Sequence, residues 1–213
     1  MKKIRDKYDK KSIQTLPRVL FNGRIIVIFS EKETDKAVEY LMKSKILGVD
    51  TETRPSFKKG KMHQVSLLQI STYDTCFLFR LNRIGLTDSL VKLLEYHQTT
   101  KVGLSLQDDL RQLNQRRAFT PGAYIELQKE VKEIGIEDMS LQKIYANLFG
   151  EKIAKSQQLS NWEAETLSEA QQYYAATDAW ACLKIHEEVT RLKREKDYIL
   201  EITPTFTDNP SNI

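Results

Sequence analysis

The sequence has few cysteines and histidines, and this limits the metal and redox chemistry that it can support. Only two cysteines occur among its 213 residues, Cys76 and Cys182, and both lie in apolar stretches without C-x-x-C spacing. Neither a disulfide framework nor a zinc site is therefore indicated. We expect two small, reduced core residues, which predicts a cytoplasmic location. The three histidines are scattered without ligand spacing.

Long hydrophobic runs and a general charge excess are also lacking. No apolar run is long enough to span a bilayer, so no membrane partner is expected. The whole net charge of +4 lies in the segment MKKIRDKYDKK, which has six basic and two acidic side chains but no signal-peptide hydrophobic region. The remainder is neutral, so bulk charge gives no argument for a nucleic-acid partner. Residues 1–20 are expected to form a basic, flexible arm.

Hydrophobic periodicity predicts alternating strands and helices. Strands are expected at 25–29, 46–52, 65–71, 76–80, 101–104 and 124–127, and helices at 31–43, 87–97, 106–117, 140–148 and 168–194. The polar segment Thr72-Tyr73-Asp74 is short enough for a hairpin turn. This order predicts a single α/β domain, a mixed sheet flanked by helices, over residues 21–201, with a flexible tail at 202–213.

Two acidic residues end the second predicted strand. Asp50 and Glu52 follow a run of apolar residues, although both are poor strand formers. Because side chains two apart in a strand share a face, the two carboxylates are expected to point the same way. A cation between them would relieve their repulsion. The pair alone also fits two solvated acids at a strand end.

A third acid lies near the start of a predicted helix. At about 100° per residue, Leu106, Leu110 and Leu113 form one apolar stripe of that helix. Asp109 borders the stripe and is expected to face the protein body. Asp108 is expected to face solvent near the helix N-terminus, where its charge is favourable. Alone, Asp109 also fits an exposed acid of the same kind.

A fourth acid shares a helical face with a tyrosine. Tyr174 and Asp178 are four residues apart, so they stack on one face with Ala181 and Ile185. An unpaired buried carboxylate on this apolar face would be costly, and a metal ion would remove that cost. A core tyrosine that hydrogen-bonds a helix acid explains the same pair.

Together these segments resemble the motifs of the DEDD superfamily of 3′-5′ exonucleases. The first motif, D-x-E, matches Asp50 and Glu52. The second matches Asp109, which follows a K-x-G segment, and the third, Y-x-x-x-D, matches Tyr174 and Asp178. This third motif indicates the tyrosine subgroup, which includes ribonuclease D and the Werner syndrome exonuclease domain.

The resemblance extends over about residues 24–195 and implies a ribonuclease-H-like fold. It includes the run RPSF after the first motif and the run SNW before the third. Tyr173 stands where the histidine subgroup carries its histidine. Residues 118–138 are the least similar stretch, and we carry no functional residue over to them.

The resemblance implies a two-metal-ion hydrolysis. Oxygen-only ligands suit Mg²⁺ or Mn²⁺, two ions per site, and argue against zinc. Asp50 would bridge the ions, Glu52 and Asp178 would lie on the nucleophile side, and Asp109 would hold the other ion through water. Tyr174 would orient the attacking water, and the products would be nucleoside 5′-monophosphates.

Candidate substrate contacts surround the acids. Thr51 lies between the first two, and Phe57, just beyond them, would stack on a terminal base. Lys58, in a basic loop, and Lys155, before the third motif, would meet backbone phosphates. A core aromatic side chain explains Phe57 equally well, and a solvated loop explains Lys58 equally well.

The substrate and the class of function stay open at two points. The same catalytic residues serve DNA and RNA, so ribonuclease-D-like processing of RNA or tRNA 3′ ends is an alternative, although the likeness to the Werner-type domain favours DNA. A non-catalytic nucleic-acid-binding module is a second alternative, but no motif carboxylate is missing. The expected partner is nucleic acid with a single-stranded or recessed 3′ end. A helicase or polymerase partner is left open.

Overall fold

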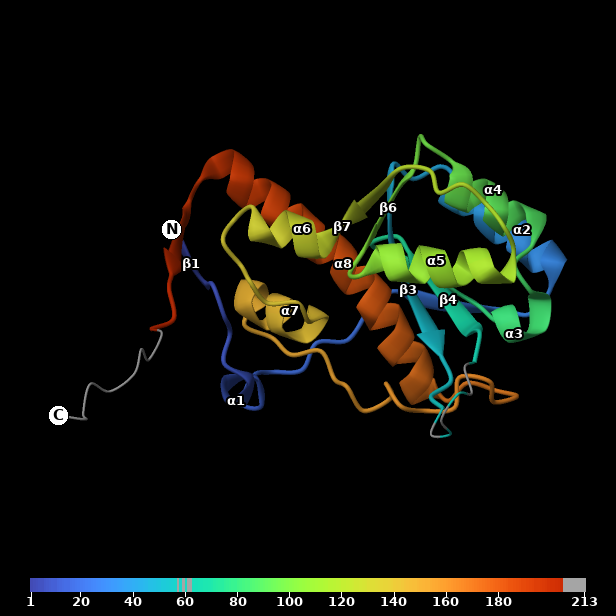
Figure 1. The fold of residues 1–213 in the computed structure, drawn as a ribbon, viewed down its shortest axis with the longest axis horizontal. Helices are drawn as coiled ribbons and strands as arrows, with labels where there is room; N and C mark the ends of the chain where they lie inside the picture. The colour runs from blue at the N-terminus through green and yellow to red at the C-terminus, as the bar shows by residue number, and fades with distance from the viewer. Residues whose placement is uncertain (57, 59, 61–62, 205–213) are drawn as a thin grey trace.

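A six-stranded mixed sheet lies at the centre of the computed structural model, which describes residues 1–56, 58, 60 and 63–204 (Figure 1). Across the sheet the strands are β2 (Arg24–Ile28), β5 (Thr75–Phe79), β4 (Val65–Ser71), β3 (Ile46–Thr53), β6 (Thr100–Gly103) and β7 (Tyr124–Glu126). β4 runs antiparallel to both of its neighbours, and the other pairs are parallel. The predicted α/β class with a mixed sheet is confirmed.

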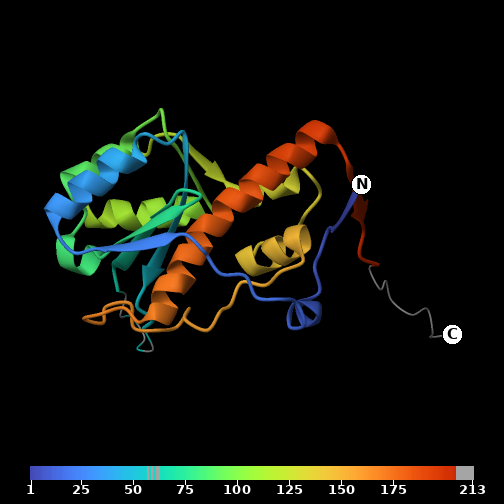
Figure 2. The ribbon, with the colours of Figure 1, turned by 180° about the vertical axis from the view of Figure 1, so that it is seen from behind.

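Helices cover both faces of this sheet. They are α1 (Lys10–Ile13), α2 (Glu31–Leu41), α3 (Leu81–Ile84), α4 (Asp88–Glu95), α5 (Leu106–Arg116), α6 (Leu127–Lys132), α7 (Leu141–Phe149) and α8 (Glu169–Glu195). α8 crosses one face and contacts the strands β2 to β6, while α5 packs on the other face of β3 (Figure 2). One apolar core lies beneath α2, α4 and α5, and two more lie along α8.

Local patterns located the longer elements well. Every predicted strand and helix is present, with ends within two residues of the prediction. The predicted hairpin turn is also present, since the Thr72 amide donates to the Thr75 carbonyl at 2.9 Å. The elements that were not predicted are α1, α3, α6 and the strands β1 (Lys2–Arg5) and β8 (Tyr198–Glu201). All are too short for a hydrophobic period to show.

The first residues are folded, where the sequence predicted a flexible arm over 1–20. β1 pairs in parallel with β8, and Ile4 is fully buried. Asn147 of α7 donates to the Arg5 carbonyl at 2.7 Å and accepts from the Arg5 amide at 2.9 Å, as a neighbouring strand would. Asp6 accepts hydrogen bonds from both the amide and the hydroxyl of Thr203. The prediction failed because these partners lie far away in the sequence.

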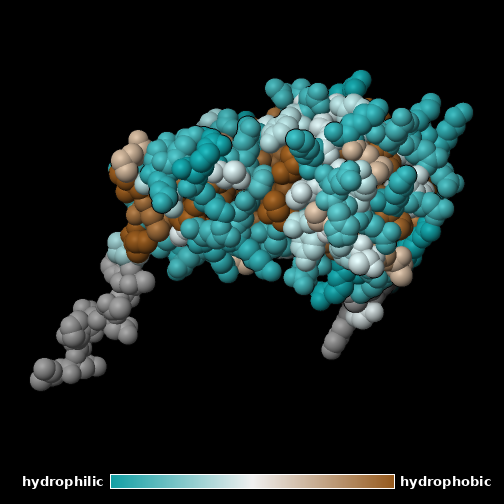
Figure 3. All heavy atoms as spheres, turned by 90° about the horizontal axis from the view of Figure 1, so that it is seen from above, coloured by the Kyte–Doolittle hydropathy of each residue, from teal (hydrophilic) through white to brown (hydrophobic). Residues whose placement is uncertain are grey.

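Polar residues cover most of the face shown in Figure 3. Hydrophobic residues gather at the end where β1 and β8 lie, and Met1, Ile199 and Ile202 are exposed. Among the described residues, no helix has the length and hydrophobicity needed to cross a membrane. Of the predicted tail at 202–213, residues 205–213 lie outside the described residues.

A close approach between β3 and α8 brings the acidic motifs together. Gly48 lies under α8, and a Cβ atom there would be 2.0 Å from the Ala179 carbonyl oxygen. Ala179 follows Asp178, and Gly48 precedes Asp50 by two residues on the same face of β3. Any side chain at position 48 would therefore push the helix away from the strand at the point where their carboxylates meet.

Gly48→Ala is expected to destabilise the protein and to lower its activity. The new methyl group would overlap a backbone atom, and overpacking of this kind costs typically about 1–3 kcal/mol. Urea unfolding followed by circular dichroism would measure the loss. Thr53→Ala, in the same strand but away from this contact, is the control. A Gly48→Ala protein as stable as the wild type would show that α8 does not need this close approach.

Candidate active site

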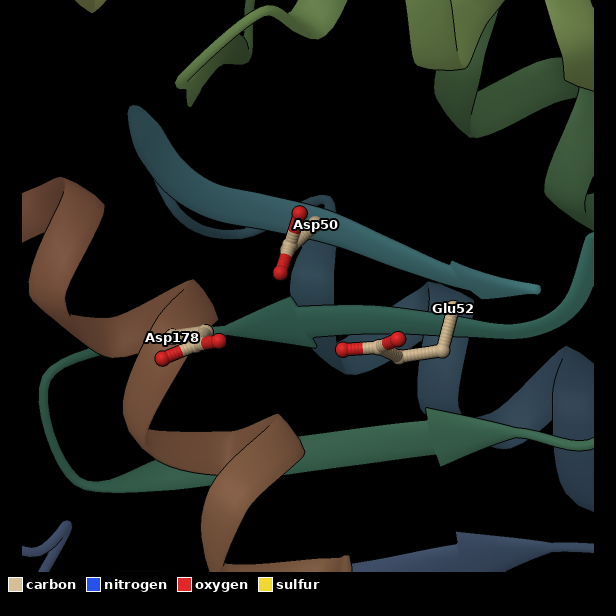
Figure 4. A group of neighbouring side chains, drawn as sticks. All are labelled: Asp50, Glu52 and Asp178. Atoms are coloured by element: carbon tan, nitrogen blue, oxygen red, sulfur yellow. The ribbon is translucent and has the colours of Figure 1, made fainter. Parts of the chain in front are cut away.

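Three of the four predicted acids form one cluster. Asp50 and Glu52 point from β3 toward α8, where Asp178 lies, and each offers an oxygen within 4.8 Å of the others (Figure 4). Glu52 is only 9% exposed and Asp178 6%. The shared strand face predicted for Asp50 and Glu52 is thus found, and the helix places the third carboxylate opposite them.

The cluster is electrostatically unfavourable without a cation. Burial raises the pKa of Asp50 and of Glu52, and each shift is increased by neighbouring carboxylates. Burial also raises the pKa of Asp178. A hydrogen bond from the Tyr174 phenol and the positive charge of Lys155 lower this pKa, but by less than burial raises it. The Oδ1 atom of Asp178 is buried and accepts no hydrogen bond from the described residues. An all-oxygen set with an unsatisfied atom matches what a hard divalent cation needs.

Asp109 approaches from the other side of β3 and lies outside the cluster of three. The Thr51 hydroxyl donates a hydrogen bond of 2.6 Å to Asp109 Oδ1. Asp109 is half-buried and Asp108 is exposed, as the helical wheel predicted. Burial raises the pKa of Asp109, and the charge of Asp50 raises it further. The charge of Asp50 therefore acts on Asp109, although Asp109 lies outside the cluster.

Tyr174 lies in α8 one turn before Asp178, between the acids and the apolar core. It is 8% exposed, and its ring centroid lies 6.0 Å from that of Trp162. Trp162 is fully buried and is thus a packing residue. A capping box formed by Ser168 and Gln171 begins α8 just before Tyr174. The start of the helix, and with it the tyrosine, is therefore well defined.

A cavity of about 280 Å³ opens beside the acids. Asp50, Glu52, Tyr174 and Asp178 line it, and Lys155 lines it as well, close enough for its charge to lower the pKa of Asp178. Thr51 also reaches the cavity. The other lining residues are Gln158, the start of α7 and the apolar residues Leu104, Ile153, Ala154 and Cys182.

Two further candidate contacts lie elsewhere. Lys58 is exposed, and it is not among the residues that line the cavity. Phe57 lies outside the described residues, so its predicted stacking role stays a prediction.

Glu163 was not identified from the sequence. Its carboxylate pairs with Arg54 at 3.1 Å and with His63 at 3.0 Å, the residues just after β3 and just before β4. The buried guanidinium of Arg80 donates to the carbonyls of Ala164 and Glu165 in the same loop. These contacts fix the segment that carries Trp162. Residues so distant in the sequence give no local signal of a shared contact.

Glu126 of β7 was also missed. Its carboxylate accepts from the Ser105 amide at 2.8 Å and from the Gln107 amide at 3.4 Å, so it caps α5 from another strand. Ser105 has φ +56° and makes no side-chain cap of its own. Glu126 falls in the stretch 118–138, where the motif resemblance offered no guidance.

The sheet crossed by one long helix, with carboxylates where they meet, has the ribonuclease-H-like fold. The model of the 3′-5′ exonuclease family matches residues 25–192, which is most of this domain. The chain belongs to the 3′-5′ exonuclease family. The resemblance to 3′-5′ exonucleases that the acidic motifs indicated is confirmed by this match.

Relatives of known sequence are longer than this chain. The mouse bifunctional 3′-5′ exonuclease/ATP-dependent helicase WRN is 27% identical over 187 residues, which cover 83% of this chain and 13% of that protein. DNA polymerase I of Aquifex aeolicus is 30% identical over 170 residues, covering 80% of this chain and 28% of that protein. The chain thus spans less than a third of either relative.

Solved structures show the same fold. The EXO domain of Aedes aegypti Nibbler superposes with a TM-score of 0.74 at 20% identity, covering 82% of this chain and 91% of that one. Escherichia coli RNase D, an exoribonuclease involved in structured RNA processing, gives a TM-score of 0.70 at 21% identity, over 82% of this chain and 46% of that one.

Proposed function

We propose that this chain removes nucleotides from the 3′ end of nucleic acid, with DNA the favoured substrate, and releases nucleoside 5′-monophosphates. The observation that carries the proposal is the cluster of Asp50, Glu52 and Asp178, with carboxylate oxygens within 4.8 Å of one another beside a cavity. Membership of the 3′-5′ exonuclease family supports the reaction class. The likeness to WRN and to a DNA polymerase favours DNA.

The proposed cofactor is a pair of Mg²⁺ or Mn²⁺ ions. Asp50, Glu52 and Asp178 would hold one ion directly, with Asp50 shared, and Asp109 would serve the second through water. When bound, the ions would activate water and stabilise the leaving 3′ oxygen. The support is the oxygen-only donor set and the unsatisfied Oδ1 atom of Asp178.

Tyr174 is proposed to orient the attacking water, not to deprotonate it. Burial and the nearby carboxylates raise the pKa of the Tyr174 phenol, so it stays protonated at neutral pH. A protonated phenol that donates to Asp178 can still accept a hydrogen bond from a water molecule, which allows it to hold that water beside Asp178. Lys155, which also lines the cavity, is proposed to meet the phosphate of the substrate.

Tyr174→Phe is expected to slow hydrolysis by about 10- to 100-fold without abolishing it. The change removes one hydrogen bond to a charged group, worth about 1.5–3 kcal/mol, and each 1.36 kcal/mol corresponds to about tenfold in rate. Single-turnover rates on a labelled oligonucleotide would measure it. Tyr173→Phe, at the neighbouring position of α8, is the control. A complete loss in Tyr174→Phe would instead assign the phenol a direct chemical role.

The function is tested by digestion of 3′-labelled and 5′-labelled single strands and recessed duplexes. With Mg²⁺ or Mn²⁺, the 3′ label is expected to appear first as a mononucleotide, while the 5′-labelled strand shortens stepwise. Chelation should stop both. Asp50→Asn should be inactive, and Asp108→Asn, an exposed acid near the site, should match the wild type. Absence of metal-dependent nuclease activity in the wild type would leave a nucleic-acid-binding module as the better explanation.

RNA is the second candidate substrate. The specific observation is the structural likeness to RNase D and to the RNase D of Trypanosoma brucei in complex with RNA U12, which has a TM-score of 0.68 at 19% identity. DNA and RNA oligonucleotides of matched sequence, digested in the same reaction, would discriminate between them. A clear preference for RNA would overturn the assignment to DNA but would leave the hydrolytic mechanism unchanged.

A further inference from the structure

The helix that carries Asp109, α5, has no capping hydrogen bond from the side chain of its own N-cap residue. Its N-cap residue, Ser105, has φ +56°, a left-handed conformation that non-glycine residues adopt only at some cost, and its side chain makes no capping hydrogen bond. The first turn of a helix leaves backbone N–H groups without partners, and each needs an acceptor. The backbone N–H groups of Ser105 and Gln107 donate to the carboxylate of Glu126.

Glu126 is itself held by the strand from which it comes. It ends β7, which pairs with β6 so that Glu126 lies opposite Gly103. Its Oε1 atom also accepts from the Gln128 amide at 3.3 Å, and the Gln128 side chain donates to the Ser105 hydroxyl at 2.9 Å. The start of α5 is therefore fixed to the edge of the sheet by a side chain that lies 21 residues beyond Ser105 in the sequence.

Thr51 completes the placement of Asp109 from the strand side. Its hydroxyl donates to Oδ1 of Asp109 at 2.6 Å, a short hydrogen bond of the kind that charged acceptors make. No described residue donates to Oδ2 of Asp109. One carboxylate oxygen is thus used for orientation and the other remains for a ligand. A hydroxyl engaged in this way has no proton left to donate to a nucleotide.

We propose that Thr51 and Glu126 are positioning residues for Asp109: the first orients its carboxylate and the second fixes the helix that bears it. The inference rests on the proposed function, because Asp109 matters only if it serves a cation. Thr51 thereby changes from a candidate substrate contact to a support of the fourth acid. Neither residue touches the reacting atoms.

The Thr51 part is tested with Thr51→Val, which removes the hydroxyl but keeps the shape, and Thr51→Ser, which keeps the hydroxyl. Loss of a partner behind a metal ligand typically costs about 10- to 100-fold in metal affinity or activity. Thr51→Val should lose that much in Mn²⁺ affinity, measured by electron paramagnetic resonance without substrate, and in kcat. Thr51→Ser should recover most of both. Thr53→Val, on the same face of β3, is the matched control.

The Glu126 part is tested by amide hydrogen exchange. Glu126→Gln keeps the size of the side chain but loses its charge and one acceptor. Exchange at Ser105 and Gln107 should accelerate by about tenfold or more, since the opening free energy falls when the cap is lost. Asp108→Asn removes a first-turn charge without touching the cap, so its exchange should change by much less than that of Glu126→Gln. Unchanged exchange in Glu126→Gln would refute the cap.

A measurement that is independent of activity separates this inference from the proposed function. Thr51→Val, Asp109→Asn and the double variant form a cycle that urea unfolding reports on metal-free protein. The proposal expects the two changes to be non-additive, and additive changes would overturn it even in an active enzyme. If the wild type neither binds Mn²⁺ nor hydrolyses nucleic acid while the cycle is non-additive, the contact stands and the proposed function fails.

Discussion

Asp178→Asn is expected to abolish hydrolysis and to stabilise the metal-free protein. Asp178 supplies one of three carboxylates that meet within 4.8 Å, so its loss removes a ligand that no neighbour replaces. A loss of at least about 10³-fold, equivalent to about 4 kcal/mol of transition-state stabilisation, is expected. In the metal-free protein the same change removes a charge that burial disfavours and that repels Asp50. A gain of about 1–3 kcal/mol in the free energy of unfolding is expected.

Urea unfolding in the presence of a chelator, beside single-turnover rates with Mn²⁺, would measure both effects on one preparation. Asp108→Asn is the control, because Asp108 is exposed and has an ion pair with Arg111 at 3.0 Å. It should change neither quantity appreciably. An Asp178→Asn protein that is less stable than the wild type would mean that the carboxylate stabilises the fold without a cation, contrary to the electrostatic account of the cluster.

Metal-free protein is expected to lose stability as the pH rises, and divalent cations should reverse the loss. Burial, together with neighbouring charges, raises the pKa values of Asp50, Glu52, Asp109 and Asp178. The folded state therefore holds protons that the unfolded chain has released above about pH 4. These groups make their full contribution to the free energy of unfolding below about pH 4. That contribution is lost as the pH rises through the raised pKa values of the folded state. For each carboxyl group, a tenfold change in acidity between the folded and unfolded states corresponds to about 1.4 kcal/mol.

Thermal unfolding between pH 5 and pH 9, with a chelator or with Mn²⁺, would measure the effect. The melting temperature should fall with pH in the chelator series and should change less with Mn²⁺, because the cation replaces the protons. A variant with Asp50→Asn and Asp178→Asn should show a flatter metal-free profile. A wild-type profile that is equally flat would show that the carboxylates do not titrate as a buried cluster.

The acids and the tyrosine of the site were predictable because each lies in a segment whose hydrophobic pattern has the period of a strand or of a helix. Asp50 and Glu52 alternate along a strand, Asp109 borders a helical stripe, and Tyr174 and Asp178 are one helical turn apart. Each segment alone fitted a structural role as well as a functional one. The family motifs joined them, and the structure then brought three of the carboxylates together while leaving Asp109 beside Thr51.

The supporting contacts were not predictable, because each joins residues that are distant in the sequence. Glu126 caps a helix from a position 21 residues beyond Ser105, and Glu163 pairs with Arg54 at a separation of 109. When an acidic side chain accepts a hydrogen bond from a backbone amide of another helix or strand, no local sequence pattern marks the contact. The left-handed Ser105 also gives no signal, since serine is a common residue before a helix. Such contacts follow only from the assembled sheet.

The pairing of β1 with β8 joins segments from opposite ends of the described chain. Arg5 and Glu201 are 196 positions apart, so their contact closes a loop that contains almost the entire chain. Loop-closure entropy makes such a contact late to form, and a short strand pair at one end of the molecule is early to open. Because Asn147 ties β1 to α7, and α7 begins at the wall of the cavity, release of the terminal strands would remove one support of that wall while α7 stayed packed on α8 and the acids on β3 and α8 kept their places.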